Sequence, residues 1–163
     1  AQWSRDGLRV WLCTVLCTYG SAPRAPGSLL AVSEGGHWVG SLSGGCVEED
    51  FLERVAAGEF NDAVAVVRYG DGSDTRSNIR LPCGGILDVL VEHLPGDCDT
   101  QAHLAQLESA LLGRRRLLRE VNLRTGQRQL HDDQSQGPRV EQGEACVRLR
   151  VGAAQRLLLA GYS

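Results

Sequence analysis

Three glycine-rich loops hold the residues of this sequence that are best suited to bind a ligand. They cover residues 20–27, 41–46 and 82–85, and each borders a predicted strand. Glycine lets the backbone approach a ligand closely, and successive N–H groups can hold an anion. The second loop leads into a predicted helix, whose N-terminus favours anions, and Arg24 in the first loop suits a phosphate. The loops predict an anion site on one rim of the sheet, although each loop alone is also explained as a simple turn.

Two cysteines in these loops are candidates for soft-ligand or sulfur chemistry. Cys46 lies at the predicted start of a helix, where the N-terminal amides favour the thiolate. Cys83 lies between Pro82 and Gly84. A thiolate suits a soft metal or the transfer of sulfur, whereas a small side chain packed at a bend is the structural alternative. The sequence does not decide which of the two cysteines is functional.

The other reactive side chains indicate packing rather than chemistry. Cys13 and Cys17 share one face of a predicted strand but lie about 13 Å apart, too far to hold one metal. Cys98 and Cys146 have no ligand spacing, and no zinc motif occurs. The four histidines are dispersed and support no hydrolase triad. Glu48 and Glu49 are candidates for a general base, although acids at these positions are also explained by stabilisation of a helix N-terminus.

Composition narrows the class of protein further. The chain has 163 residues, 42% of them hydrophobic, and a net charge of −3, which indicates one globular core. No basic stripe or long apolar run occurs, which argues against nucleic-acid and membrane partners. The absence of an initial Met predicts a piece of a longer protein. Six cysteines without a signal peptide favour a reduced, cytoplasmic setting.

Alternating strand and helix patterns predict an α/β fold, with a mixed β-sheet flanked by helices. The run 9–19 is almost continuously apolar, as in a central strand buried on both faces. Helices are expected at 46–57 and 100–112, and a polar loop at 131–143. The expected strands are 9–19, 29–33, 38–42, 63–69, 86–92, 117–123, 127–130, 147–151 and 156–161.

The ordered loop motifs resemble those of one known family. Residues 20–27 read GSAPRAPG, 40–48 read GSLSGGCVE, 81–85 read LPCGG and 89–92 read VLVE. This set resembles the amino-terminal domain of the XdhC/CoxI family, the xanthine dehydrogenase accessory factors. A Rossmann-like domain follows in that family, and RLLLAG at the chain end resembles its first strand. The resemblance implies an amino-terminal domain over 1–150 and the start of a truncated second domain over 155–163.

The resemblance also implies a maturation factor rather than an enzyme. Such a factor binds molybdenum cofactor (molybdopterin), protects it during sulfuration and delivers it to a molybdenum hydroxylase of the xanthine dehydrogenase type. A cysteine desulfurase or sulfurtransferase is the implied second partner, and a homodimer is compatible with the sequence. Cys46 is the candidate ligand for molybdenum or sulfur. The candidate cofactor-binding residues are Gly20, Ser21, Arg24, Gly27, Ser43, Gly44, Gly45, Cys46, Glu48, Cys83, Gly84 and Gly85.

Two other classes of function stay open from the sequence. One is an NAD(P)-dependent oxidoreductase whose nucleotide domain lies outside this chain, since no complete G-x-G-x-x-G occurs here. The other is an interaction module that docks a sulfurtransferase or the hydroxylase. Binding of molybdenum cofactor, of NAD(P), or of neither separates the three classes.

Overall fold

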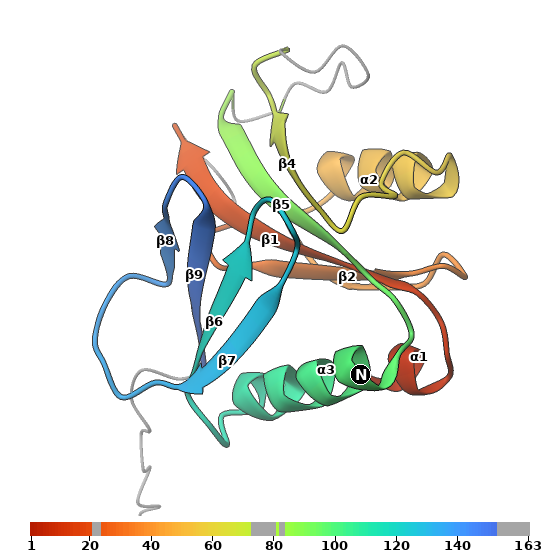
Figure 1. The fold of residues 1–163 in the computed structure, drawn as a ribbon. Helices are drawn as coiled ribbons and strands as arrows, with labels where there is room; N and C mark the ends of the chain where they lie inside the picture. Colours follow the sequence, from red (N-terminus) through yellow and green to blue (C-terminus); the bar gives the residue numbers. More distant parts are fainter. Residues whose placement is uncertain (21–23, 73–80, 82–83, 153–163) are drawn as a thin grey trace, which may run out of the picture.

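The computed structural model describes residues 1–20, 24–72, 81 and 84–152. Within these residues, two antiparallel sheets pack with two long helices (Figure 1). The first sheet has the strand order β3-β2-β1-β5-β4 and the second has the order β7-β6-β9-β8. In chain order, the elements are α1 (Gln2–Arg5), β1 (Val10–Tyr19), β2 (Leu29–Ser33), β3 (Trp38–Gly40), α2 (Cys46–Ala56), β4 (Val64–Tyr69), β5 (Ile86–Leu94), α3 (Cys98–Leu111), β6 (Leu117–Asn122), β7 (Arg128–Asp132), β8 (Val140–Gln142) and β9 (Cys146–Val151).

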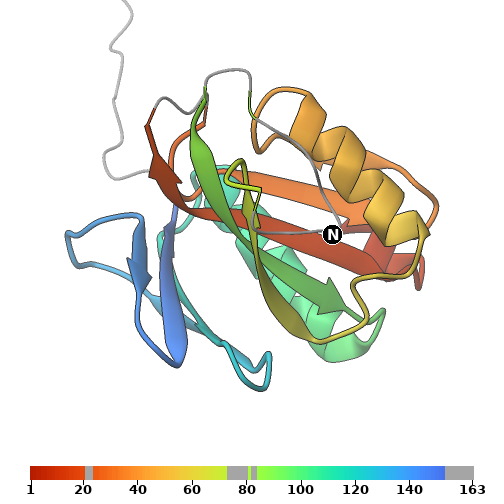
Figure 2. The same cartoon turned by 90° about the horizontal axis from the view of Figure 1, so that it is seen from above.

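Strand β1 is the centre of the fold and is buried on both faces, as its apolar run predicts. One face carries Cys13 and Val15, which pack in one cluster with Val47 and Phe51 of α2. On the other face, Leu12 packs toward α3, and Leu16 packs against the second sheet. Alternation of side chains along a strand separates these two sets. The first sheet is therefore covered by α2 on one side and by α3 and the second sheet on the other (Figure 2).

The predicted α/β class is confirmed, but the pairing differs from the mixed sheet that we expected. Every strand pair among the described residues is antiparallel, and the strands form two sheets. Strands β1, β2 and β3 form an antiparallel meander, and β4 and β5 form a second antiparallel pair. Strand β5 of this pair lies beside β1. Helix α2 carries the chain from β3 at one edge to β4 at the other. Strands that run in the same direction are thus never neighbours.

Most predicted elements form with small shifts of their ends. Helix α3 begins two residues earlier than expected because the Asp97 side chain caps it, accepting a hydrogen bond from the Thr100 N–H at 2.8 Å. The polar stretch 131–143 was expected to be a loop, yet it contains β8, which pairs with β9. Helix α1 was not expected. The predicted strand 156–161, and with it the predicted second domain at 155–163, lies outside the described residues.

A cluster of buried charges joins the two sheets. Arg119 of β6 is 1% exposed, and its Nη2 donates to Oε1 of fully buried Glu92 on β5 at 2.7 Å. Its Nε donates to Nε2 of His103 at 2.8 Å. Burial, together with Arg119 and Arg128, lowers the pKa of His103 to about 3, so this imidazole is neutral and accepts. The cluster links β5, α3 and β6 at one point.

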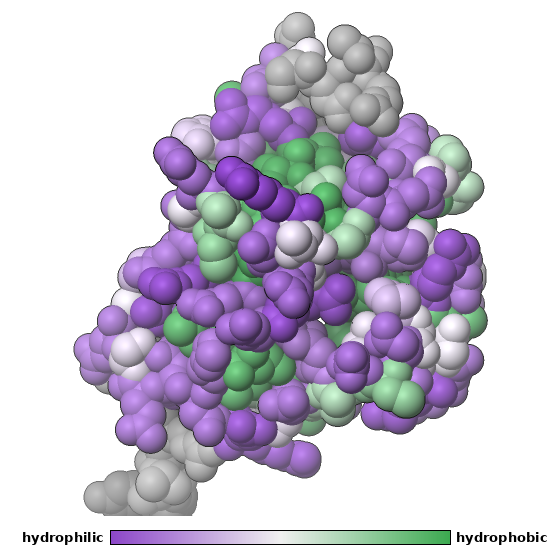
Figure 3. Space-filling model, in the orientation of Figure 1, coloured by the Kyte–Doolittle hydropathy of each residue, from purple (hydrophilic) through white to green (hydrophobic). Residues whose placement is uncertain are grey.

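The surface is consistent with a chain that buries most of its large apolar side chains. The face seen in Figure 3 is mainly hydrophilic, and its apolar areas are small and separated. Among the described residues, no helix has the length and apolar character needed to cross a membrane.

Candidate functional site

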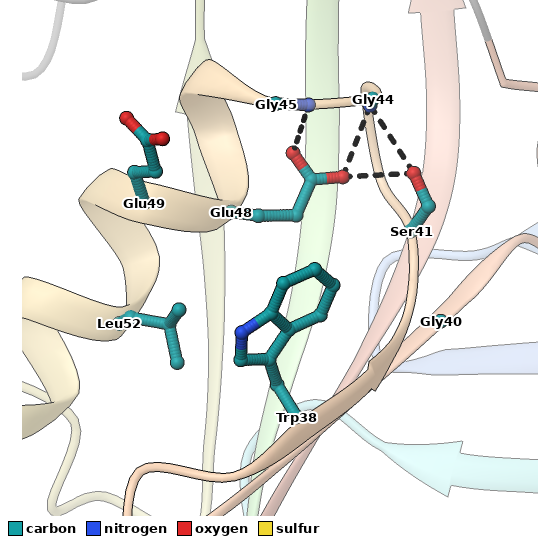
Figure 4. Close-up of a pocket in the computed structure, with 8 residues that line it drawn as sticks. All are labelled: Trp38, Gly40, Ser41, Gly44, Gly45, Glu48, Glu49 and Leu52. Atoms are coloured by element: carbon teal, nitrogen blue, oxygen red, sulfur yellow. Dashed lines mark hydrogen bonds between the residues drawn. The ribbon is translucent and has the colours of Figure 1, made fainter.

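The loop before α2 is folded around the carboxylate of Glu48. Oε1 accepts the N–H groups of Leu42, Ser43 and Gly44 at 2.6, 2.8 and 3.1 Å. Oε1 also accepts the Ser41 hydroxyl at 2.9 Å, while Oε2 accepts the Gly45 N–H at 2.8 Å and the Ser43 hydroxyl at 2.9 Å. Figure 4 shows this carboxylate turned toward the loop. The chain therefore supplies its own anion to a nest of backbone amides.

Glu48 is ionised throughout the ordinary pH range. Burial opposes the charge, but the amides of Ser43, Gly44, Gly45 and Leu42 outweigh burial, so the pKa of Glu48 lies well below its usual range. Glu48 is the third residue of α2, and its bond to the Gly45 N–H is half of a capping box. Glu48 thus stabilises the start of α2 as expected, and it also accepts the amides of the preceding loop.

This arrangement differs from the anion site that the glycine-rich loop predicts. The amides of Ser43, Gly44 and Gly45 were expected to face an external phosphate, yet they donate to Glu48. A phosphate at these amides would have to displace a carboxylate that six donors hold. The hydrogen bonds to Glu48 fix the conformation of the loop. Arg24 is then the candidate for binding a phosphate.

Described parts of the three glycine-rich loops meet at one end of the first sheet. Arg24 Nε donates to Ser41 Oγ at 3.3 Å, which links the first loop to the second. A Cβ added to Gly20 would lie 3.6 Å from Cα of Gly85, so the first and third loops are adjacent. Of the other candidate glycines in these two loops, Gly84 is exposed and Gly27 is half-buried. Ser21 and Cys83 lie outside the described residues, so their predicted roles stay predictions.

Cys46 is the first residue of α2, and its side chain is exposed. Cys98 is similarly exposed at the first residue of α3, while Cys13 is fully buried. The described residues contain no group of three or more His, Cys, Asp or Glu side chains that could hold a metal ion. Cys46 can thus offer a single sulfur ligand to a metal that is already bound to other ligands.

A pocket of about 540 Å³ lies between β3 and α2, beside this loop. Its lining comprises Trp38, Gly40, Ser41, Gly44, Gly45, Glu48, Glu49 and Leu52 (Figure 4). Trp38 is 50% exposed, an unusual state for so large an apolar side chain. Trp38 and Leu52 were not predicted as site residues from the sequence, and Glu49 was considered only as a general base. Only the proximity of Trp38 to the glycine-rich loop could have pointed to them.

These features define an α/β protein in which a loop folded around a carboxylate, an exposed thiol and a pocket adjoin one another. Residues 3–70 match the XdhC and CoxI family, which confirms the resemblance carried by the loop motifs. The match includes the first two glycine-rich loops and all of α2.

Individual relatives agree with the family. The chain is 35% identical over 101 residues to the molybdenum cofactor insertion chaperone PaoD of Escherichia coli, covering 60% of this chain and 30% of that protein. It is 33% identical over 85 residues to a probable xanthine dehydrogenase subunit of Bacillus subtilis, covering 51% and 26%. The chain therefore spans less than a third of the length of either relative.

A solved structure confirms the fold. The crystal structure of a xanthine dehydrogenase from Bacillus halodurans superposes with a TM-score of 0.61 at 23% identity. The superposition covers 90% of this chain and 49% of that one.

Proposed function

We propose that this chain binds molybdenum cofactor as part of a non-enzymatic accessory protein. Cys46 carries the proposal, because it places an exposed thiol directly after a rigid loop and beside a pocket. The name of the Escherichia coli relative, a molybdenum cofactor insertion chaperone, supports the same cargo. The bound cofactor would be protected during sulfuration and then delivered to a molybdenum hydroxylase of the xanthine dehydrogenase type.

The chemistry needed for this role is binding and shielding, and the site residues suit it. The sulfur of Cys46 is a soft ligand suited to molybdenum. Arg24 supplies a cation for the cofactor's phosphate. A sulfurtransferase and the client hydroxylase would act on the cofactor from the exposed side of Cys46, in the cytoplasm.

The test compares two cysteines in the same structural position. Cys46→Ser and Cys98→Ser each change an exposed thiol at the first residue of a helix. We expect Cys46→Ser to lose most of the molybdenum cofactor bound per folded chain, and Cys98→Ser to retain it. Both variants should keep the unfolding temperature of the parent, because both side chains are exposed.

Cys13→Ser is the second control, for a purely structural role. Burial, aided by Glu92, raises the pKa of the Cys13 thiol well above its usual value, so it packs as a neutral group. A buried hydroxyl should cost about 1–3 kcal/mol of stability and leave cofactor per folded chain unchanged. Undiminished cofactor binding by Cys46→Ser would contradict the assignment of Cys46 and transfer it to Cys83.

A further inference from the structure

The pocket beside the loop has a chemistry unlike that of a phosphate site. Among the described residues, its lining contains an indole, an aliphatic side chain and two carboxylates, those of Glu48 and Glu49, but no basic residue. Acids repel a phosphate, whereas an open aromatic face attracts a flat ring. The pocket therefore favours a planar ligand that donates hydrogen bonds.

The two carboxylates are not equivalent. Glu48 is 4% exposed, and both of its oxygens are held by the loop. Glu49 is exposed on the next position of α2, and none of the residues drawn in Figure 4 donates a hydrogen bond to it. Glu49 is thus the carboxylate at this pocket that can accept from a ligand, while Trp38 of β3 supplies a half-exposed ring.

Taking the proposed function as its basis, we propose that this pocket holds the pterin ring of the cofactor. Trp38 stacks on the ring system, and Glu49 accepts from the pterin's amino group and the neighbouring ring N–H. These two donors lie side by side, as the two oxygens of a carboxylate require. The acids then exclude the phosphate end, which is left to Arg24. Cys46 directly follows Gly45 of the pocket wall, and the metal-binding end of the cofactor is left to its thiol.

Neopterin, which has the pterin ring but no phosphate, dithiolene or metal, tests this assignment on the 163-residue chain. We expect the parent chain to quench neopterin fluorescence saturably, as stacking on Trp38 requires. Trp38→Leu should weaken neopterin binding about tenfold, and Trp38→Phe should restore part of it. Glu49→Gln should also weaken binding about tenfold, because a charged acceptor is lost. Glu53→Gln, one turn further along the same helix and outside the pocket lining, should have no effect.

Three results would overturn the pterin pocket: no quenching by the parent chain, or undiminished affinity in Trp38→Leu or in Glu49→Gln. If the parent retains molybdenum cofactor through Cys46 but does not bind neopterin, the pocket assignment alone is wrong. If neopterin binds but the cofactor is not retained, the pocket binds a pterin ring but the proposed function fails. The unfolding temperature of each variant, measured in parallel, identifies any loss of binding caused by misfolding.

Discussion

Glu48→Gln is expected to loosen the loop at 41–45 and to lower the free energy of unfolding by about 3 kcal/mol. The carboxylate accepts from four backbone amides and two hydroxyls, whereas an amide turns an N–H₂ group toward some of these donors. Denaturant unfolding measures the loss, and hydrogen exchange at the Ser43, Gly44 and Gly45 amides should become faster. Glu49→Gln is the matched control and should stay within about 0.5 kcal/mol of the parent. Equal stability of the two variants would refute the central role of Glu48.

The same carboxylate makes stability dependent on acid. Because the pKa of Glu48 is lowered in the folded chain, its contribution is present above the ordinary value of 4.5 and is lost as the pH falls below it. The stability difference between the parent and Glu48→Gln should therefore shrink below about pH 4.5. A difference that stays constant down to about pH 3 would show that the hydrogen bonds do not depend on ionisation.

Arg119→Met is expected to lower the free energy of unfolding by about 3 kcal/mol. The substitution leaves Glu92 fully buried without its partner at 2.7 Å. Arg128, whose Nε lies 3.5 Å from the same oxygen, retains some compensation and keeps the cost near the lower end for broken buried pairs. Chemical denaturation followed by circular dichroism measures it.

Two comparisons isolate the buried charge as the cause. Arg148→Met removes an arginine that is 58% exposed and bonded to Glu120, so it should cost less than about 1 kcal/mol. Adding Glu92→Gln to Arg119→Met should recover part of the loss, because the unpaired charge is gone. A loss below about 1 kcal/mol in Arg119→Met, or no recovery in the double variant, would rule out this explanation.

The fold was predictable where one local pattern dominates. The apolar run of β1 reflects burial of that strand on both faces. The spacing of Val47, Phe51 and Val55 reflects burial of α2 on one face. The division into two antiparallel sheets was not predictable from such patterns, because an apolar run does not say which strand lies beside it. Strand β8 was missed since its three residues carry one apolar side chain, Val140, and it forms by pairing with β9.

The same limit applies to the candidate site. Glycines and Cys46 at a helix start are local signals, and the structure places the thiol on the surface there. The enclosure of Glu48 depends on the path of the loop, and composition cannot give that path. The pocket requires β3 at one sheet edge with α2 beside it, and Glu92 meets Arg119 only because two sheets pack together. The contact between Glu92 and Arg119 joins elements distant in sequence, whereas the enclosure of Glu48 depends on the conformation of a short local loop.

Cofactor binding by the unmodified chain tests the proposed function most directly. Native mass spectrometry would follow the chain after incubation with molybdenum cofactor released from a purified molybdenum hydroxylase, and separately with NAD(P). We expect a complex with one cofactor per chain and no complex with NAD(P). Retention of NAD(P) in place of the cofactor, or of neither molecule, would contradict the proposed function.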